Sequence, residues 1–200
     1  MKKVIYIQQE LYPHQIEELK EIAPTYEIVE SIEEVDPDAV EIILGWSDEM
    51  ISIVDSTESQ LKWIQYPFAG VNNLPLKQFK ENNIMLTNGS GLHANSVTET
   101  TMGLLLGLSR KIVQSVKNQL QQNWTREGFY LGLTDRTMLI VGAGKIGVQL
   151  ARVAKAFDMK TIGINRSGRK IEHMDEQYTI NQLPEVIHKG DVVVNILPLT

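Results

Sequence analysis

The stretch that decides the fold is residues 137–157, TMLIVGAGKIGVQLARVAKAF. It opens with an apolar segment, Met138–Val141, that has the length of a buried strand. Three glycines follow in a G-x-G-x-x-G pattern, at Gly142, Gly144 and Gly147, and apolar residues then recur at helical spacing. A strand, a glycine turn and a helix in this order are typical of a dinucleotide-binding βαβ unit.

Each glycine in this pattern has its own physical role. Gly142 permits the tight turn, Gly144 lets the backbone approach a pyrophosphate, and Gly147 lets the helix lie close to the strand. Amides at the helix N-terminus, around Lys145 and Ile146, are placed to receive the phosphate charge. The alternative is a glycine turn in another kind of α/β protein, which the strand, loop and helix context disfavours. We therefore predict that the chain binds NAD or NADP.

The end of the second strand bears on the choice between these cofactors. An NAD site normally has a carboxylate here that accepts hydrogen bonds from the ribose hydroxyls. Residues 163–170, GINRSGRK, contain none. Asn165 does not repel a 2′-phosphate, and Arg166 and Ser167, with Arg169 as a further candidate, can bind one through charge-assisted hydrogen bonds. We hypothesise that NADP is favoured over NAD; the alternative is that these are solvated loop cations.

Composition excludes several other classes of protein. The 200 residues are 42% hydrophobic and 22% charged, as in an ordinary globular protein. The absence of cysteine excludes disulfides, thiolate metal sites and a cysteine nucleophile; we assign no metal site and expect a cytoplasmic location. A net charge of −6 gives no footprint for nucleic acid. The first apolar run ends after four residues and no other run is long enough to span a bilayer, so we expect no membrane partner.

The rest of the chain alternates strands and helices, which predicts an α/β fold. Besides 137–141, the expected strands are 3–7, 26–30, 40–45, 61–66, 84–87, 161–165 and 191–197. Helices are expected at 13–22, 146–157 and 183–188, together with one long helix over 95–122 that is buried in its first half.

The glycines at 89–91 predict a hinge before the long helix. We expect a substrate domain at residues 1–93 and a dinucleotide domain, with its crossover helix, at 94–200. A doubly wound dinucleotide domain normally has about six strands, so we expect this one to be incomplete at residue 200.

Several ordered blocks carry a resemblance to a known family. They are 61–65 (LKWIQ), 69–74 (AGVNNL), 86–88 (LTN), 97–99 (VTE), 105–110, 141–166 and 193–200. In their order and spacing they resemble the D-isomer-specific 2-hydroxyacid dehydrogenases, which include glyoxylate/hydroxypyruvate reductases and phosphoglycerate dehydrogenase. The resemblance implies a flavodoxin-like substrate domain, a Rossmann NAD(P)-binding domain with a doubly wound parallel sheet, and a homodimer formed through the second domain.

The resemblance also implies site residues. The family holds the substrate carboxylate by backbone amides in a loop that matches Phe68–Val71, so Ala69 and Gly70 become candidates; the alternative is a plain strand-to-helix turn. Trp46 either lines the substrate cleft or belongs to the core. Weaker assignments to the cofactor site are Thr101, Leu197 and Pro198, because such residues are commonly there for packing.

One part of the family pattern is missing. The family transfers hydride with an arginine that orients the keto acid and a histidine with a glutamate partner, and all three follow the segment that matches residues 197–200. The catalytic residues therefore remain unassigned, with His93 only a weak candidate for lining the cleft. We expect an NAD(P)-dependent oxidoreductase for a small 2-keto or 2-hydroxy acid, whose 200 residues alone bind but do not turn over. The alternatives are a phosphoglycerate dehydrogenase, which the lack of a carboxylate at Asn165 mildly disfavours, and a nucleotide-sensing, corepressor-like binding protein.

Overall fold

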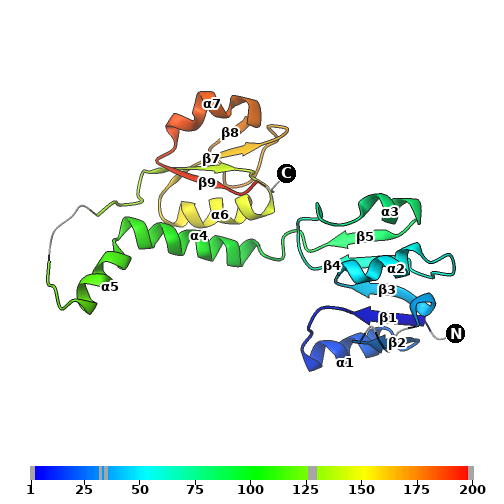
Figure 1. Ribbon diagram of the computed structural model, residues 1–200. Coiled ribbons are helices and arrows are strands. Elements are labelled where there is room, and N and C mark those ends of the chain that lie inside the picture. Colours follow the sequence, from blue (N-terminus) through cyan, green and yellow to red (C-terminus); the bar gives the residue numbers. More distant parts are fainter. Residues whose placement is uncertain (1–2, 32, 34–35, 126–129, 198–200) are drawn as a thin grey trace. The chain divides into compact units, whose positions relative to one another are not determined.

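The structure is a computed structural model that describes residues 3–31, 33, 36–125 and 130–197 (Figure 1). The chain forms two compact units, residues 1–90 and 91–200. The sequence places the corresponding boundary after residue 93.

The described part of the first unit contains a parallel sheet with the strand order β2-β1-β3-β4-β5. Its strands are β1 (Lys3–Ile7), β2 (Tyr26–Val29), β3 (Val40–Leu44), β4 (Trp63–Tyr66) and β5 (Met85–Asn88). This order is that of flavodoxin-like doubly wound sheets. The expected fold of the first unit is therefore confirmed.

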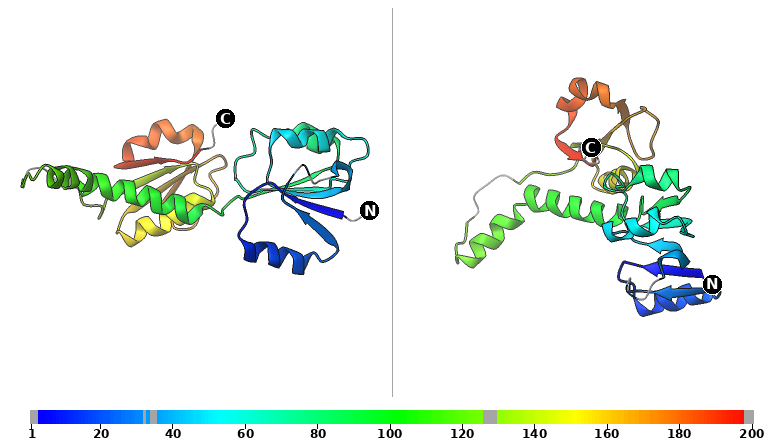
Figure 2. Two further views of the ribbon diagram at one scale, coloured as in Figure 1. Left: turned by 60° about the horizontal axis from the view of Figure 1, so that its bottom comes forward. Right: turned by 45° about the vertical axis from the view of Figure 1, so that its right-hand side comes forward.

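Helices cover both faces of this sheet (Figure 2). Helix α1 (Pro13–Ile22) lies on one face, and α2 (Ile51–Asp55) and α3 (Leu76–Glu81) lie on the other. The short 3-10 turn η2 (Pro37–Ala39) leads into β3, and η3 (Asp48–Met50) leads from β3 into α2. Residues of β1 are buried on both faces, because its apolar run is continuous. The loops at the carboxyl ends of the strands are left to form a site.

The described part of the second unit contains a parallel sheet with the strand order β8-β7-β6-β9. Its strands are β6 (Thr137–Val141), β7 (Lys160–Asn165), β8 (Glu176–Thr179) and β9 (Val192–Asn195). In order of sequence this is 3-2-1-4, the arrangement of a dinucleotide-binding Rossmann sheet, with the order reversing between β6 and β9. The Rossmann expectation is confirmed, although β8, a polar edge strand, is not predicted from the sequence.

Two helical layers enclose the second sheet (Figure 2). Helices α4 (Ala94–Ser109) and α6 (Lys145–Ala156) cover one face, where Met102 and Leu150 pack with Ile140 of β6. The other face packs on α7 (Leu183–Val186), which lies between the 3-10 turns η4 (Ile180–Gln182) and η5 (Ile187–Lys189). The central strand β6 is therefore buried on both sides and fixes the turn that follows it.

The single helix expected over 95–122 is wrong. The chain forms α4 and then a separate helix, α5 (Ile112–Leu120), because Lys111 adopts a left-handed conformation with φ 54°. The amide of Leu131 donates to the carbonyl of Ser109 at 3.0 Å and so occupies an acceptor that a continuous helix would use. The first half is also more exposed than expected, since Leu104 and Leu108 are 67% and 77% exposed.

A buried carboxylate joins three strands of the first unit and the residue that precedes β4. Glu41 of β3 accepts hydrogen bonds from the hydroxyl of Tyr26 at 2.6 Å and from the ammonium groups of Lys62 and Lys3, the latter forming an ion pair at 3.0 Å. Its side chain is 6% exposed. The lysines and the tyrosine together lower the pKa of Glu41 from 4.5 to about 2, despite the opposing effect of desolvation.

This carboxylate gives the first unit a defined acid dependence. A carboxyl whose pKa is lower in the folded state stabilises the fold above the pKa of the unfolded chain, and the contribution is lost as pH falls through the folded value. We expect Glu41→Gln to lower the free energy of unfolding at neutral pH by on the order of 1 kcal/mol. The difference from the unsubstituted chain should shrink between about pH 4.5 and pH 2. Urea unfolding across this pH range measures the difference, and Glu58→Gln is the control because Glu58 and Glu41 line one surface recess. A pH-independent difference would contradict the lowered pKa of Glu41.

Candidate functional site

The turn after β6 requires a glycine. Gly142 has φ +88°, and a Cβ added there would lie 2.9 Å from the carbonyl carbon of Ile196. The amides of Gly142 and Ala143 both donate to the carbonyl of Ile164 at 2.9 and 2.8 Å. The turn is thus held between the ends of β7 and β9, as the sequence predicts for the first glycine of the loop.

The next glycine begins α6. Gly144 is the N-cap residue and offers no side chain to the first-turn amides. An added Cβ would meet only the carbonyl oxygen of Gly142, at 3.8 Å. Among the described residues, no hydrogen bond engages the amides of Ile146 and Gly147. The helix therefore presents free N–H groups and its positive dipole end where a phosphate can approach.

Gly147 has a packing role. A Cβ there would lie 3.3 Å from Cβ of Ala143 and 3.4 Å from Cγ2 of Ile140, so a side chain would push α6 away from β6. This agrees with the close helix-to-strand contact expected for the third glycine.

A recess of about 540 Å³ opens at the carboxyl end of this sheet. It is lined by residues that follow all four described strands: Gly142, Ala143, Gly144, Ile164, Asn165, Arg166, Ser167, Arg169, Ile180 and Leu197. The recess lies where ligands bind in open α/β sheets, beside the reversal of strand order. Most of the cofactor residues predicted from the sequence are brought together here.

Sequence reasoning missed one wall of this recess. Ile180 follows β8 and is 36% exposed, and the polar segment 176–179 gives little sign of a strand. A capping box between Thr179 and Gln182 is the signal that could have located the turn.

The loop after β7 is closed by the side chain of Asn165. Its Oδ1 accepts from the amides of Ser167 and Gly168 at 3.0 and 2.6 Å, and its Nδ2 donates to the carbonyl of Arg169 at 3.0 Å. The side chains of Arg166 and Ser167 line the recess from this loop. The described lining residues include no carboxylate and no histidine, so the recess can bind anionic groups but supplies no proton-transfer group.

Four predicted cofactor residues are described but are not part of the lining: Lys145, Ile146, Gly147 and Thr101. The side chain of Lys145 lies against Gly91, where an added Cβ would be 2.7 Å from its Cδ. The hydroxyl of Thr101 donates to the carbonyl of Val97 at 2.7 Å, within α4. Pro198 falls outside the described residues. Metal-binding arrangements of acidic, histidine or cysteine side chains are absent from the described residues.

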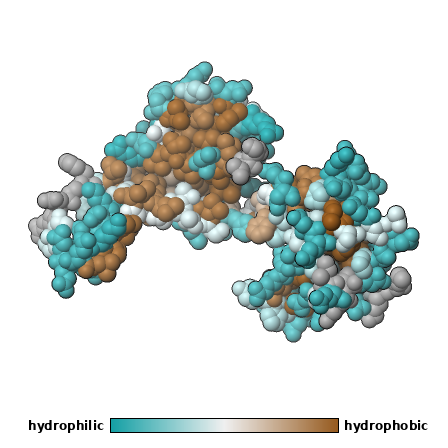
Figure 3. Space-filling model, viewed as in Figure 1, coloured by the Kyte–Doolittle hydropathy of each residue, from teal (hydrophilic) through white to brown (hydrophobic). Residues whose placement is uncertain are grey.

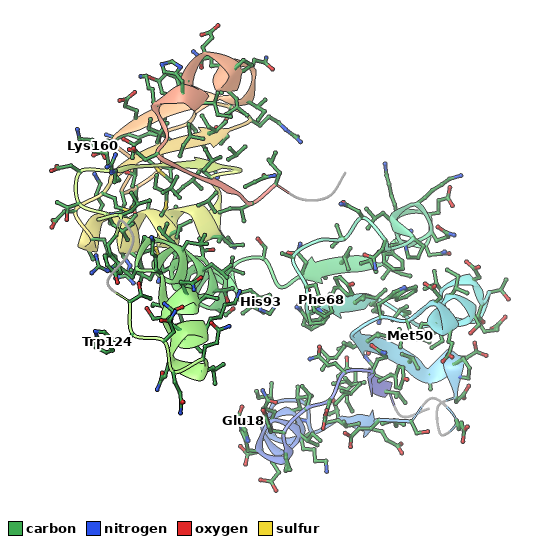
Figure 4. The ribbon with its side chains drawn as sticks, turned by 60° about the vertical axis from the view of Figure 1, so that its left-hand side comes forward. Glu18, Met50, Phe68, His93, Trp124 and Lys160 are labelled. Carbon is green, nitrogen blue, oxygen red and sulfur yellow. The ribbon has the colours of Figure 1, made fainter. Side chains whose placement is uncertain are left out.

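The predicted carboxylate loop of the first unit follows β4, with Phe68 at its start (Figure 4). The amide of Gly89 donates to the carbonyl of Phe68 at 3.2 Å, and Nδ2 of Asn88 donates to that of Ala69 at 2.8 Å. Because N–H and C=O are antiparallel in a trans peptide, the amide of Gly70 points away from Asn88. A Cβ on Gly70 would have no neighbour within 4 Å in the described structure.

Trp46 is partly buried and packs against the core of the first unit. Its ring packs edge-on against Phe79 with a centroid distance of 4.9 Å. Its indole Nε1 is buried and has no hydrogen-bond partner in the described part of the chain. Of the two interpretations left open by the sequence, this packing favours the core residue.

The fold and the recess define a dinucleotide-binding α/β protein. Residues 102–200 match the family model described as "D-isomer specific 2-hydroxyacid dehydrogenase, NAD binding domain". The chain belongs to this family, as the resemblance of its sequence blocks implies, and its second unit binds a nicotinamide cofactor.

Relatives extend the likeness over both units. The chain is 27% identical over 192 residues to a glyoxylate reductase of Pyrococcus furiosus, covering 92% of this chain and 56% of that protein. It is 29% identical over 177 residues to a D-3-phosphoglycerate dehydrogenase of Methanocaldococcus jannaschii, covering 87% and 33%. A solved D-isomer specific 2-hydroxyacid dehydrogenase family protein of Aeromonas salmonicida is similar with a TM-score of 0.85 and 26% identity, over 100% of this chain and 65% of that one.

The chain thus spans between a third and about half of the length of these two curated relatives. Of the helices described, none combines the length and the apolar composition that crossing a bilayer requires.

The two glycines of the turn should respond differently to alanine. We expect Gly142→Ala to lower the melting temperature and abolish dinucleotide binding, because the added Cβ clashes with the backbone of Ile196 at a positive φ. Gly144→Ala should melt near the unsubstituted chain yet bind about tenfold or more weakly, because its Cβ points into open space at the expected pyrophosphate position. Calorimetry measures the two melting temperatures, and NADPH titration measures the two affinities. Unchanged NADPH affinity in Gly144→Ala would refute the placement of the pyrophosphate at Gly144.

Proposed function

We propose that this chain is the substrate-loop and cofactor-binding part of an NADP-preferring D-2-hydroxyacid dehydrogenase that reduces a small 2-keto acid such as glyoxylate or hydroxypyruvate. In this proposal residues 1–93 form the substrate domain and residues 94–200 the cofactor domain. The observation that carries it is the recess in which a glycine turn, a free helix N-terminus and a cationic loop meet.

The residues of the recess fit a dinucleotide. Open space at Gly144 and the unengaged amides of Ile146 and Gly147 suit the pyrophosphate. Ile180 and Leu197 provide apolar surface for the adenine end. When bound, the nicotinamide would supply or accept the hydride.

The preference for NADP rests on the loop after β7. Arg166, Ser167 and Arg169 offer guanidinium and hydroxyl donors to a 2′-phosphate. No carboxylate among the described lining residues repels that phosphate or takes the two ribose hydroxyls of NAD. Solvated cations remain the alternative, and the relative affinities of the two cofactors decide between them.

The substrate class rests on the loop after β4. The amide of Gly70, which points away from Asn88, and the open space where a Cβ of Gly70 would lie suit a carboxylate. Among the described residues no hydrogen bond engages the amides of Gly70 and Val71. Ala69 supplies the carbonyl that fixes this peptide. The glyoxylate reductase relative, which matches 92% of the chain, supports a small keto acid. A phosphoglycerate dehydrogenase would instead favour NAD, and a corepressor-like protein would bind the nucleotide without turnover.

Cofactor titration and turnover test this function together. The 200-residue chain should bind NADPH at least tenfold more tightly than NADH, since charge-assisted hydrogen bonds contribute about 1.5–3 kcal/mol. It should not oxidise NADPH, because no residue of the chain is assigned as the arginine, the glutamate or the histidine that the family uses for hydride transfer.

A protein that contains this chain together with the family's arginine, glutamate and histidine should oxidise NADPH with glyoxylate or hydroxypyruvate. Tighter NADH binding would overturn the cofactor proposal. NADPH oxidation by the 200 residues alone would show that they contain the catalytic group. Binding without turnover in the protein that carries the arginine, glutamate and histidine would favour the corepressor-like alternative.

We also propose that the second unit forms a homodimer through α4 and α5. Figure 3 shows apolar surface over the second unit and on α5. Helix α5, all of which is described, buries none of its residues. The exposed apolar residues of the two helices are Leu104, Leu108, Ile112, Val113, Val116 and Leu120, and Trp124, just beyond, is 88% exposed (Figure 4). Apolar surface of this extent is typical of a protein interface.

Charge placed on these helices should separate the copies. We expect the unsubstituted chain to have twice its single-chain mass of 22.6 kDa, and Leu108→Glu combined with Val116→Glu to give the single-chain mass. Ile22→Glu, at an 80% exposed residue of α1, is the matched control and should stay dimeric. Light scattering after size exclusion measures all three; a monomeric unsubstituted chain at high concentration would contradict the proposal.

A further inference from the structure

Asn165 uses both ends of its carboxamide within its own loop. The oxygen accepts from the amides of Ser167 and Gly168 at 3.0 and 2.6 Å, and the nitrogen donates to the carbonyl of Arg169 at 3.0 Å. Asn165 stands at the position where an NAD site normally has the carboxylate that accepts hydrogen bonds from the ribose. The side chain therefore acts on the loop rather than standing free in the recess.

These bonds fix residues 165–169 as a closed loop. Gly168 has φ +66°, and an added Cβ would lie 3.1 Å from Cγ2 of Thr179, so the far side of the loop rests against the end of β8. The backbone is thus held on both sides of Arg166 and Ser167, two of the residues that line the recess. Holding a binding loop before the ligand arrives reduces the conformational entropy lost on binding.

Of the residues close to asparagine in size, only asparagine can make all three bonds. Aspartate can accept from the two amides but cannot donate to the carbonyl of Arg169, which would then face a negative oxygen. Alanine makes none of the bonds. The loop geometry therefore requires the carboxamide for a reason separate from the charge of a cofactor.

We propose that Asn165 is a positioning residue: it closes the 165–169 loop in the conformation that directs Arg166 and Ser167 to a phosphate on the ribose 2′ position. This rests on the proposed NADP preference, which it deepens by assigning selectivity to the closed loop as a unit. Replacing Asn165 weakens recognition of the 2′-phosphate by releasing Arg166, without removing any group that touches the phosphate.

A double-mutant cycle on the 200-residue chain tests this. The probes are adenosine 2′,5′-bisphosphate and 5′-AMP, which differ only in the 2′-phosphate. Asn165→Ala and Arg166→Ala should each weaken binding of the bisphosphate about tenfold and leave 5′-AMP nearly unchanged. In the Arg166→Ala background, Asn165→Ala should have little further effect, because the two residues act through one contact.

Lys170→Ala is the charge control, since Lys170 is exposed on the same segment but does not line the recess; it should leave both affinities unchanged. Asn165→Asp should also lose selectivity, because it loses the bond to the carbonyl of Arg169 and its negative charge repels the phosphate. Effects of Asn165→Ala and Arg166→Ala that multiply independently, or unchanged selectivity in Asn165→Ala, would overturn the proposal.

Hydrogen exchange separates this proposal from the cofactor proposal. The amides of Ser167 and Gly168 should be protected without ligand and should exchange faster in Asn165→Ala, with the melting temperature of the chain preserved. If the unsubstituted chain binds both probes equally, the NADP preference fails while protected amides still support the role of Asn165 in closing the loop. Unprotected amides overturn that role whatever the cofactor.

Discussion

The second unit depends on one close approach, where the backbone of Gly142 lies against that of Ile196. The contact brings the ends of β6 and β9 together at the point where the strand order reverses. It also fixes the start of α6, and hence the direction in which the free amides of its first turn point. The binding chemistry of the unit is therefore set by backbone geometry, and the side chains around it adjust which nucleotide fits.

Much of this could be predicted from the sequence. The bounds of α1, β1 and β6 agree with the apolar spacing, since each element is fixed by a local pattern and a strong start or stop signal. The glycine loop could also be predicted, because each glycine meets a steric requirement of its own turn or helix. The break between α4 and α5 could not be predicted, because it depends on the hydrogen bond from the amide of Leu131 to the carbonyl of Ser109, groups that lie 22 residues apart in the chain.

The candidate site divides in the same way. The cationic character of the loop after β7 is visible in its composition, but the direction of the Asn165 carboxamide is set by the turn around Gly168. Similarly, the block at 69–74 marks a turn, whereas the peptide orientation at Gly70 depends on Asn88 from the neighbouring strand. Local residue types indicate which functional groups are available, and contacts between distant segments decide the direction in which those groups point.

The two edges of the second sheet are chemically different. At one edge, β8 carries Glu176, whose carboxylate pairs with Lys189 at 2.7 Å and accepts a hydrogen bond from Tyr178. At the other, β9 is a run of valines with Val193 49% exposed, and among the described strands it has a neighbour only in β6. The charged side chains at the β8 edge disfavour pairing with a further strand, whereas the apolar β9 edge favours it. The described sheet can consequently be extended in one direction only, and the further strands of a doubly wound sheet of about six strands would add at β9.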